Sequence, residues 1–136
     1  MVRDIIRDEE FLSLPSQDCT FPDKKLFDDL KDTLRFHKDR CLGLAANMIG
    51  ERKRALALYM EDSIKVMFNP TILSALDDYE TEEGCLSLDG VRKTKRYETI
   101  QVLYFDWKGR EKISLFNGIS AEVIQHEMDH MNGILI

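Results

Sequence analysis

The spacing of apolar residues predicts a helix near each end of the chain. In the first, apolar residues recur every three or four positions and Pro22 stands where a first-turn proline would, so we expect a helix from Pro22 to about Lys38. The residues that set this period are Leu26, Phe27, Leu30 and Leu34. The second helix is expected over residues 121–130, because Ser120 is a favourable N-cap and Gly133 a favourable stop signal.

Strands are predicted between these helices by runs that are rich in apolar and β-branched residues. They cover residues 55–60, 64–68, 98–107 and 111–116. Asn69-Pro70 predicts a turn before residues 71–73, and Lys108-Gly109 predicts that the last two strands form a hairpin. This order of elements is typical of the α+β class, with the final helix packed against a sheet.

Composition limits the interpretation to one globular domain covering residues 1–136. The chain is long enough to bury a core without disulfides, and its 43% hydrophobic and 32% charged residues are ordinary for such a domain. A net charge of −6 argues against a nucleic-acid surface, which would need a basic stripe. No stretch has membrane-spanning length, and the N-terminus has no apolar signal region. Three widely spaced cysteines do not form a disulfide framework, so we expect a reducing cytoplasm.

The most informative segment is the HExxH motif from His126 to His130. Positions i and i+4 share one face of a helix, so both histidines can bind one metal ion with Glu127 beside them as a proton carrier. A catalytic site of the zinc type normally has three protein ligands and a water. No His, Cys, Asp or Glu follows His130, so the third ligand must lie upstream, and Cys85 is available there.

Each part of this constellation also has a structural explanation. HExxH occurs by chance, and a single cysteine is more often a small buried apolar residue than a ligand. The combination favours a metal site, because two of the three histidines have ligand spacing and a Gly84-Cys85 turn supplies the missing position. His37 lies far from any other ligand type and is interpreted as a surface residue.

Three segments together resemble the motifs of the peptide deformylases, in the order found in that family. They are Cys41-Leu42-Gly43-Leu44-Ala45-Ala46-Asn47-Met48, Glu83-Gly84-Cys85-Leu86-Ser87 and His126-Glu127-Met128-Asp129-His130. They correspond to the family runs G-x-G-x-A-A-x-Q, E-G-C-x-S and H-E-x-D-H. Phe68-Asn69-Pro70 and Arg96 also fit, so the resemblance spans nearly the whole chain.

The resemblance implies a metal-dependent hydrolase that removes the formyl group from the N-terminal formyl-methionine of nascent proteins near the ribosome. Small antiparallel or mixed sheets would pack around the central HExxH helix. Cys85, His126 and His130 would bind one divalent ion, natively Fe(II), with zinc or nickel also possible. Glu127 would transfer the proton. No direct contact with nucleic acid or with a membrane is implied, and the oligomeric state is left open.

The same resemblance assigns the remaining site residues. The backbone N–H of Leu86 and the motif's glutamine would stabilise the oxyanion, while Leu42, Gly43 and Gly84 would line the substrate cleft. Glu83 is expected to be buried and paired, with Arg96 as a candidate partner. Cys41 replaces the motif's first glycine, and this change concerns only how tightly the backbone must pack at that position.

Met48 stands at the position of the family glutamine, and a thioether has no proton to donate. In an extended segment the neighbouring Asn47 would point to the opposite face, so it would not replace the donor. The loss of one such donor costs about 10²–10³ in rate in another hydrolase. One alternative is therefore a deformylase-like paralogue that binds metal and peptide N-termini with weak or no activity. A further alternative is another metallohydrolase, such as a small aminopeptidase or amidase.

Overall fold

A computed structural model describes residues 1–136 and contains one sheet and three α-helices. The helices are α1 (Glu9–Leu12), α2 (Lys24–Phe36) and α3 (Gly118–Met131), and a 3₁₀ turn η1 spans Ala46–Ile49. The strands are β1 (Gly43–Ala45), β2 (Ala55–Met60), β3 (Ser63–Cys85), β4 (Leu88–Phe105) and β5 (Glu111–Asn117). All neighbouring strands are antiparallel, in the order β1-β2-β3-β4-β5. The expected α+β class is confirmed, with the strands joined in one continuous sheet.

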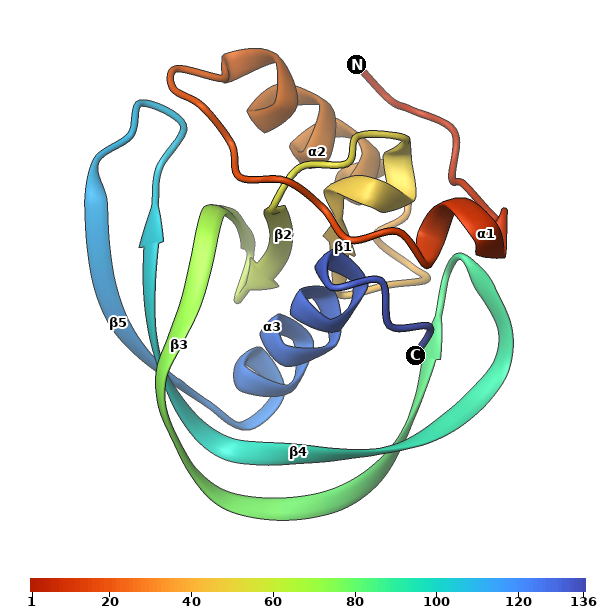
Figure 1. Cartoon of the computed structure of the whole chain (residues 1–136), viewed down its shortest axis with the longest axis vertical. Coiled ribbons are helices and arrows are strands. Elements are labelled where there is room, and N and C mark those ends of the chain that lie inside the picture. The colour runs from red at the N-terminus through yellow and green to blue at the C-terminus, as the bar shows by residue number, and fades with distance from the viewer.

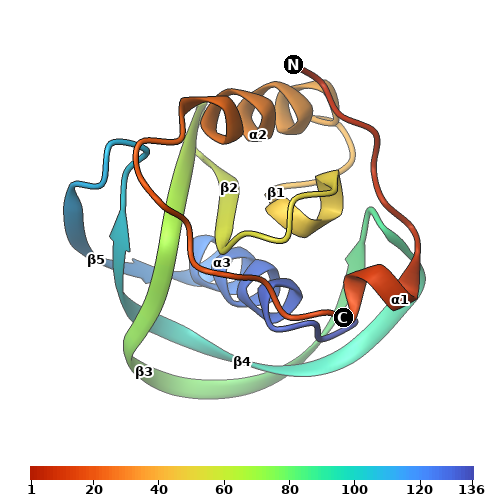
Figure 2. The same cartoon turned by 45° about the horizontal axis from the view of Figure 1, so that its top comes forward.

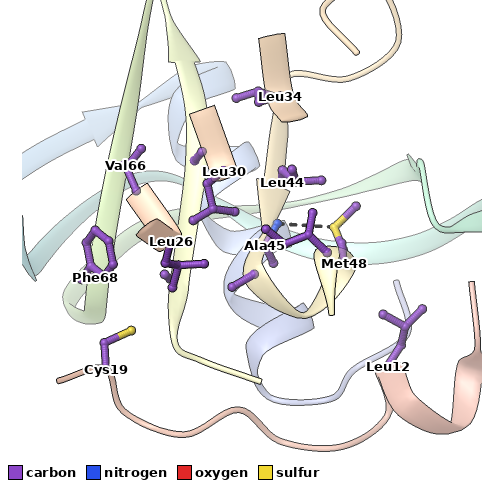
Figure 3. Packing of buried hydrophobic residues seen from close by; sticks show 14 of the residues in the cluster. Leu12, Cys19, Leu26, Leu30, Leu34, Leu44, Ala45, Met48, Val66 and Phe68 are labelled. Atoms are coloured by element: carbon purple, nitrogen blue, oxygen red, sulfur yellow. Dashed lines mark hydrogen bonds between the residues drawn. The ribbon is translucent and has the colours of Figure 1, made fainter. Parts of the chain in front are cut away.

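The sheet separates two apolar clusters because successive side chains of a strand point to opposite faces. On β2, Ala55 and Ala57 face the cluster that includes α2, whereas Leu56 and Leu58 face the cluster beneath α3. Figures 1 and 2 show α2 on one side and α3 enclosed by the long, curved ribbon of β3 and β4. Figure 3 shows the first cluster, in which side chains of α2 meet those of the strands. The C-terminal helix is therefore central, as expected.

The predicted starts of both main helices are wrong. Helix α2 begins at Lys24, because the carboxylate of Asp23 accepts a 3.1 Å bond from the Leu26 N–H and makes Asp23 the N-cap. Helix α3 begins at Gly118, directly after β5, so the expected cap Ser120 lies within its first turn. The end of α3 agrees better with the prediction, since Gly133 follows it with a φ of +76°.

Asn69-Pro70 does not end a strand, contrary to the prediction. Strand β3 continues through it with a register shift between Phe68 and Thr71, and Asn69 adopts a φ of +47°. Such an irregularity is a β-bulge, and asparagine tolerates its left-handed backbone conformation. The Asn69 side chain also bonds the backbone N–H and C=O of Cys19 at 2.7 and 3.1 Å. The bulge therefore holds the segment before α2 against the sheet.

The predicted hairpin near the C-terminus is confirmed, but β4 is much longer than expected. Residues Thr99–Phe105 pair with Glu111–Asn117, and Gly109 turns the chain with a φ of +91°. Strand β4 starts at Leu88, so β3 and β4 pair up to the tight turn at Leu86-Ser87. That ribbon carries Cys85 to the end of α3. None of the helices combines the length and hydrophobicity that a membrane-spanning helix needs.

Candidate metal centre and substrate pocket

Three potential ligand atoms meet where the ribbon end approaches α3. Nε2 of His130 lies 3.2 Å from Nε2 of His126 and 3.2 Å from Sγ of Cys85, and the ligand atoms of the three residues all lie within 4.8 Å of one another. Tetrahedral ligands at normal zinc–nitrogen and zinc–sulfur bond lengths are about 3.3–3.6 Å apart. The two histidines are one helical turn apart, as the HExxH spacing requires. The arrangement fits a divalent metal ion.

His126 is oriented by a buried carboxylate on the side opposite the ligand cluster. Its Nδ1 lies 2.8 Å from Oε1 of Glu83, and because an ionised carboxylate only accepts, Nδ1–H is the donor. This bond leaves Nε2 free to face the other two ligands. Such outer support is typical of metal-binding histidines.

Glu83 is held in turn by Arg96, which confirms the predicted pair. The guanidinium donates to Glu83 Oε1 at 2.7 Å and to Asp129 Oδ2 at 2.7 Å, so it links β3, β4 and α3. Although burial raises the pKa of Glu83, the bonds from His126 and Arg96 hold it below its usual range. The carboxylate therefore stays ionised at neutral pH and keeps His126 in one orientation.

The two histidines differ in their electrostatic surroundings. Burial and the positive charge of His126 lower the pKa of His130 to about 3, and His130 is fully buried. Burial also lowers the pKa of His126, but hydrogen bonds to Cys85 and Glu83 raise it to about 10 overall. Without a cation, a proton therefore resides on His126, beside the ionised carboxylate of Glu83. A metal ion that binds there must displace it.

Glu127 lies beside the ligand cluster with its side chain in the protein interior. Burial raises its pKa to about 7, although the neighbouring His126 lowers it. Oε1 has no hydrogen-bond partner, and Oε2 lies 3.1 Å from where a Cβ on Gly43 would be. A carboxylate with this pKa can accept and release a proton near neutral pH.

A cavity of about 710 Å³ opens beside this cluster and contains eight of the nine site residues predicted from the sequence. These eight are Leu42, Gly43, Met48, Gly84, Cys85, Leu86, His126 and Glu127. The ninth, His130, is buried behind them. Leu42 lines the cavity and is half-exposed.

Comparison with known proteins agrees with this geometry. The family model described as polypeptide deformylase matches residues 2–136. The chain is 52% identical over 136 residues to the peptide deformylase of Clostridium beijerinckii, with both chains covered completely. It is 39% identical over 114 residues to that of Dictyoglomus thermophilum, which covers 83% of this chain and 73% of the relative.

The chain belongs to the peptide deformylase family.

Solved structures of deformylases have the same fold. The Legionella pneumophila enzyme superposes with a TM-score of 0.88 at 33% identity, covering 99% of this chain and 83% of that one. A class I type b peptide deformylase from Acinetobacter baumannii, bound to Met-Ala-Ser, gives a TM-score of 0.88 at 28% identity, covering 99% and 96%. Nothing in these similarities supports the alternative of a small aminopeptidase or another amidase.

Met48, at the position of the deformylase glutamine, is buried and lines the cavity. Its Sδ accepts a 3.4 Å hydrogen bond from the Ala45 N–H, drawn in Figure 3. The expectation that Asn47 lies in an extended segment is wrong, since Asn47 and Met48 belong to η1. The Asn47 amide instead donates to the His130 carbonyl at 2.8 Å. The Asn47 side chain is therefore bonded to the end of α3.

Sequence reasoning missed several residues that line the deformylase cavity. Ile119, Glu122 and Val123 precede His126 at helical spacing, so the period of the final helix could have indicated them. Arg7 reaches the cavity from the N-terminal segment, and no local pattern pointed to it. His37 lies at the C-cap of α2, outside this site, as expected.

Proposed function

We propose that this chain hydrolyses the formamide of N-formyl-methionine at the N-terminus of nascent proteins, releasing formate and a free amine. The observation that carries this proposal is the convergence of the Cys85, His126 and His130 ligand atoms beside Glu127 in a cavity wide enough for a peptide end. Family membership supports the same reaction.

The proposed metal ligands are Cys85 Sγ and the Nε2 atoms of His126 and His130. A divalent ion held there supplies a Lewis acid and lowers the pKa of a water molecule. We propose Fe(II) as the native ion, with zinc and nickel as possible replacements, because one thiolate and two imidazoles suit all three. The buried network of Glu83 and Arg96 supports this assignment by fixing the orientation of His126.

Glu127 is the proposed general base and acid. Its carboxylate takes the proton of the attacking water and delivers it to the departing amine, so one group serves both half-reactions. A pKa raised by burial suits this exchange, because both protonation states are then accessible near neutral pH.

The backbone N–H of Leu86 is the proposed donor to the developing oxyanion. It lies in the turn immediately after Cys85, next to the cavity. Met48, whose sulfur already accepts from Ala45, supplies no second donor. The reaction would therefore proceed with one donor fewer than the family motif provides.

We propose that Gly43 and Gly84 pair their backbone groups with an extended peptide and that Leu42 contacts the methionine side chain. A Met-Ala-Ser peptide is bound in the Acinetobacter baumannii deformylase, which supports a substrate of this class. A nascent chain near the ribosome is then the partner, and the cytoplasm is the proposed location.

The alternative is a paralogue that binds metal and peptide N-termini with weak or no activity. Its argument is Met48 alone, and the comparisons do not favour it, since the 52%-identical relative is a peptide deformylase.

The deciding experiment is a deformylation assay with formyl-Met-Ala-Ser and anaerobically prepared protein loaded with Fe(II) or Ni(II). We expect turnover by the wild type, none by metal-free Cys85→Ala, and a strongly reduced rate in metal-bound Glu127→Gln. A metal-loaded wild type that binds the peptide but releases no formate would favour the paralogue.

A further inference from the structure

The N-terminal segment contacts the two loops that flank the metal centre. The Ile6 N–H donates to the Met48 carbonyl at 2.8 Å, and the next residue, Arg7, donates through Nη1 to the Leu86 carbonyl at 3.1 Å. Nη2 of Arg7 also bonds Asp89 Oδ1 at 2.7 Å. In Figures 1 and 2 this segment runs beside the tip of the β3–β4 ribbon. The Arg7 guanidinium thus bonds both the Asp89 carboxylate and the turn after Cys85.

The peptide unit that Arg7 contacts also contacts a proposed metal ligand. The Leu86 C=O and the Ser87 N–H belong to one planar, trans peptide group, so they point in opposite directions. Arg7 occupies the carbonyl end from the protein surface. At the other end, the Ser87 N–H donates to Cys85 Sγ at 3.4 Å. One peptide group therefore connects the guanidinium to the thiolate.

From this connection we infer that Arg7 is a positioning residue for the metal centre, acting on the Cys85 thiolate through the Leu86–Ser87 peptide group. The inference rests on the proposed metal ligation by Cys85. A positive charge at the carbonyl oxygen polarises the peptide and strengthens its N–H as a donor, because hydrogen bonds in a chain reinforce one another. A stronger N–H···S bond withdraws electron density from the sulfur, which makes a bound metal ion a better Lewis acid. The same contact fixes the turn that carries the Leu86 N–H.

The environment of Arg7 agrees with this role better than with a purely structural one. Its side chain is about half exposed, and its ion-pair partner Asp89 is almost fully exposed, so the pair contributes little to stability. The bidentate geometry still matters, since a guanidinium can hold the carbonyl and the carboxylate at once, whereas an ammonium is a point donor. Arg7 also lines the cavity, so a direct contact with the substrate is the competing role to be tested.

The first test is spectroscopic and does not depend on catalysis. Cobalt(II) is bound to the wild type, Arg7→Ala, Arg7→Lys and, as a control, Arg35→Ala, which removes an exposed arginine on α2. Weakening the N–H···S bond leaves the thiolate more electron-rich, so its charge-transfer band should move to longer wavelength in Arg7→Ala. We expect a smaller shift in Arg7→Lys and none in Arg35→Ala. An unchanged band in Arg7→Ala, with cobalt bound, would overturn the inference.

The second test separates positioning from substrate contact. With formyl-Met-Ala-Ser and its C-terminal amide, Arg7→Ala should lower kcat about threefold to tenfold for both peptides and leave KM nearly unchanged. This loss is smaller than the about 10–100-fold that is typical of residues bonded directly to a metal ligand, because Arg7 acts through a peptide group. A rise in KM for the free acid alone would show that Arg7 binds the peptide carboxylate and would contradict the inference. If the wild type bound cobalt without a thiolate band, the proposed ligand set would fail as well. If the band behaved as expected but no peptide were hydrolysed, only the proposed function would fail.

Discussion

At the scale of single residues, the proposed chemistry depends on where protons reside. The carboxylate of Glu83 accepts from His126, so that histidine presents Nε2 to the ligand cluster. Glu127, one residue later, has an unpartnered oxygen and a pKa raised by burial to about 7. One carboxylate bonds His126 and the other belongs to the next residue, and their different partners give them different functions. Glu83 remains charged, and Glu127 exchanges a proton.

The raised pKa of Glu127 predicts the acid side of the activity profile. A general base acts only when deprotonated, so kcat/KM should fall as the pH is lowered through the pKa of Glu127. A bound cation stabilises the carboxylate, so the midpoint in the metal-loaded enzyme should lie at or below about 7. The measurement is kcat/KM from pH 5 to 9 with metal content checked at each pH. In Glu127→Gln the remaining activity should lack this midpoint, and an unchanged midpoint in that variant would assign the titration to another group.

Met48→Gln tests whether a second oxyanion donor increases the rate. Glutamine has nearly the length of methionine, and its Oε1 can accept from the Ala45 N–H as the sulfur does, leaving the amide N–H₂ to face the cavity. We expect kcat to rise, by up to about 10²-fold if the donor reaches the oxyanion. Met48→Leu is the matched control, since it keeps the volume but donates nothing. A gain below twofold in Met48→Gln, with the fold and metal content intact, would mean that the Leu86 N–H suffices.

At the scale of elements, the site depends on how the β3–β4 ribbon is fastened to α3. Arg96 on β4 bonds both Glu83 on β3 and Asp129 on α3, and the side chains of Arg96 and Glu83 are almost fully buried. The pairing therefore fixes Cys85, two residues beyond Glu83, relative to the histidines on the helix. Buried charges of this kind stabilise a structure only when all of them are paired.

Removing Arg96 should accordingly be costly. Arg96→Ala leaves Glu83 buried without its cation and Asp129 without its ion-pair partner, so we expect the free energy of unfolding to fall by about 3–5 kcal/mol. Lys95→Ala is the matched control on the neighbouring position of β4. Its ion pair with Asp78 is exposed, so stability should change little. Urea unfolding followed by circular dichroism measures both, and equal losses in the two variants would contradict the assigned role of the network.

The same elements explain how far the sequence predicted the structure. Both main helices and the C-terminal hairpin follow from apolar periodicity, because each buries one face in an apolar cluster. The start of each helix depends on a local feature that leaves no periodic signal. For α2 this feature is the N-cap Asp23, and for α3 it is the direct junction with β5 after Asn117. The bulge at Asn69 was mistaken for a turn because the dipeptide Asn-Pro is a common turn signal.

The site residues divide in a similar way. His126 and His130 were predictable since their spacing on one helix is local. Cys85 was predicted because no His, Cys, Asp or Glu follows His130, and in the structure its sulfur lies near the ligand atoms of the two histidines. The contact of Arg7 with the Leu86 carbonyl joins positions 79 residues apart through a backbone atom. No side-chain pattern in the sequence can indicate such a contact.

At the scale of the whole molecule, a metal ion would act as a cross-link between two parts of the fold. Cys85 comes from the end of β3 and the two histidines come from α3. The two apolar clusters lie on opposite faces of the sheet, one toward α2 and the other toward α3. The protein has no disulfide that could play this part, since all three cysteines are free. Ligation should therefore contribute directly to the stability of the folded state.

Metal removal should lower the thermal stability of the protein, by an amount that grows with the logarithm of the metal affinity. A ligand that binds only the folded state at a free concentration of one hundred times its Kd stabilises it by about 2.7 kcal/mol. Chelator should therefore lower the Tm of the wild type, and added Zn(II) or Ni(II) should restore it with about one equivalent bound. Cys85→Ala should lose both the metal and the metal-dependent shift. His37→Ala removes the one histidine outside the site, so it should keep both, and loss of the shift in that variant would mean that the metal binds elsewhere.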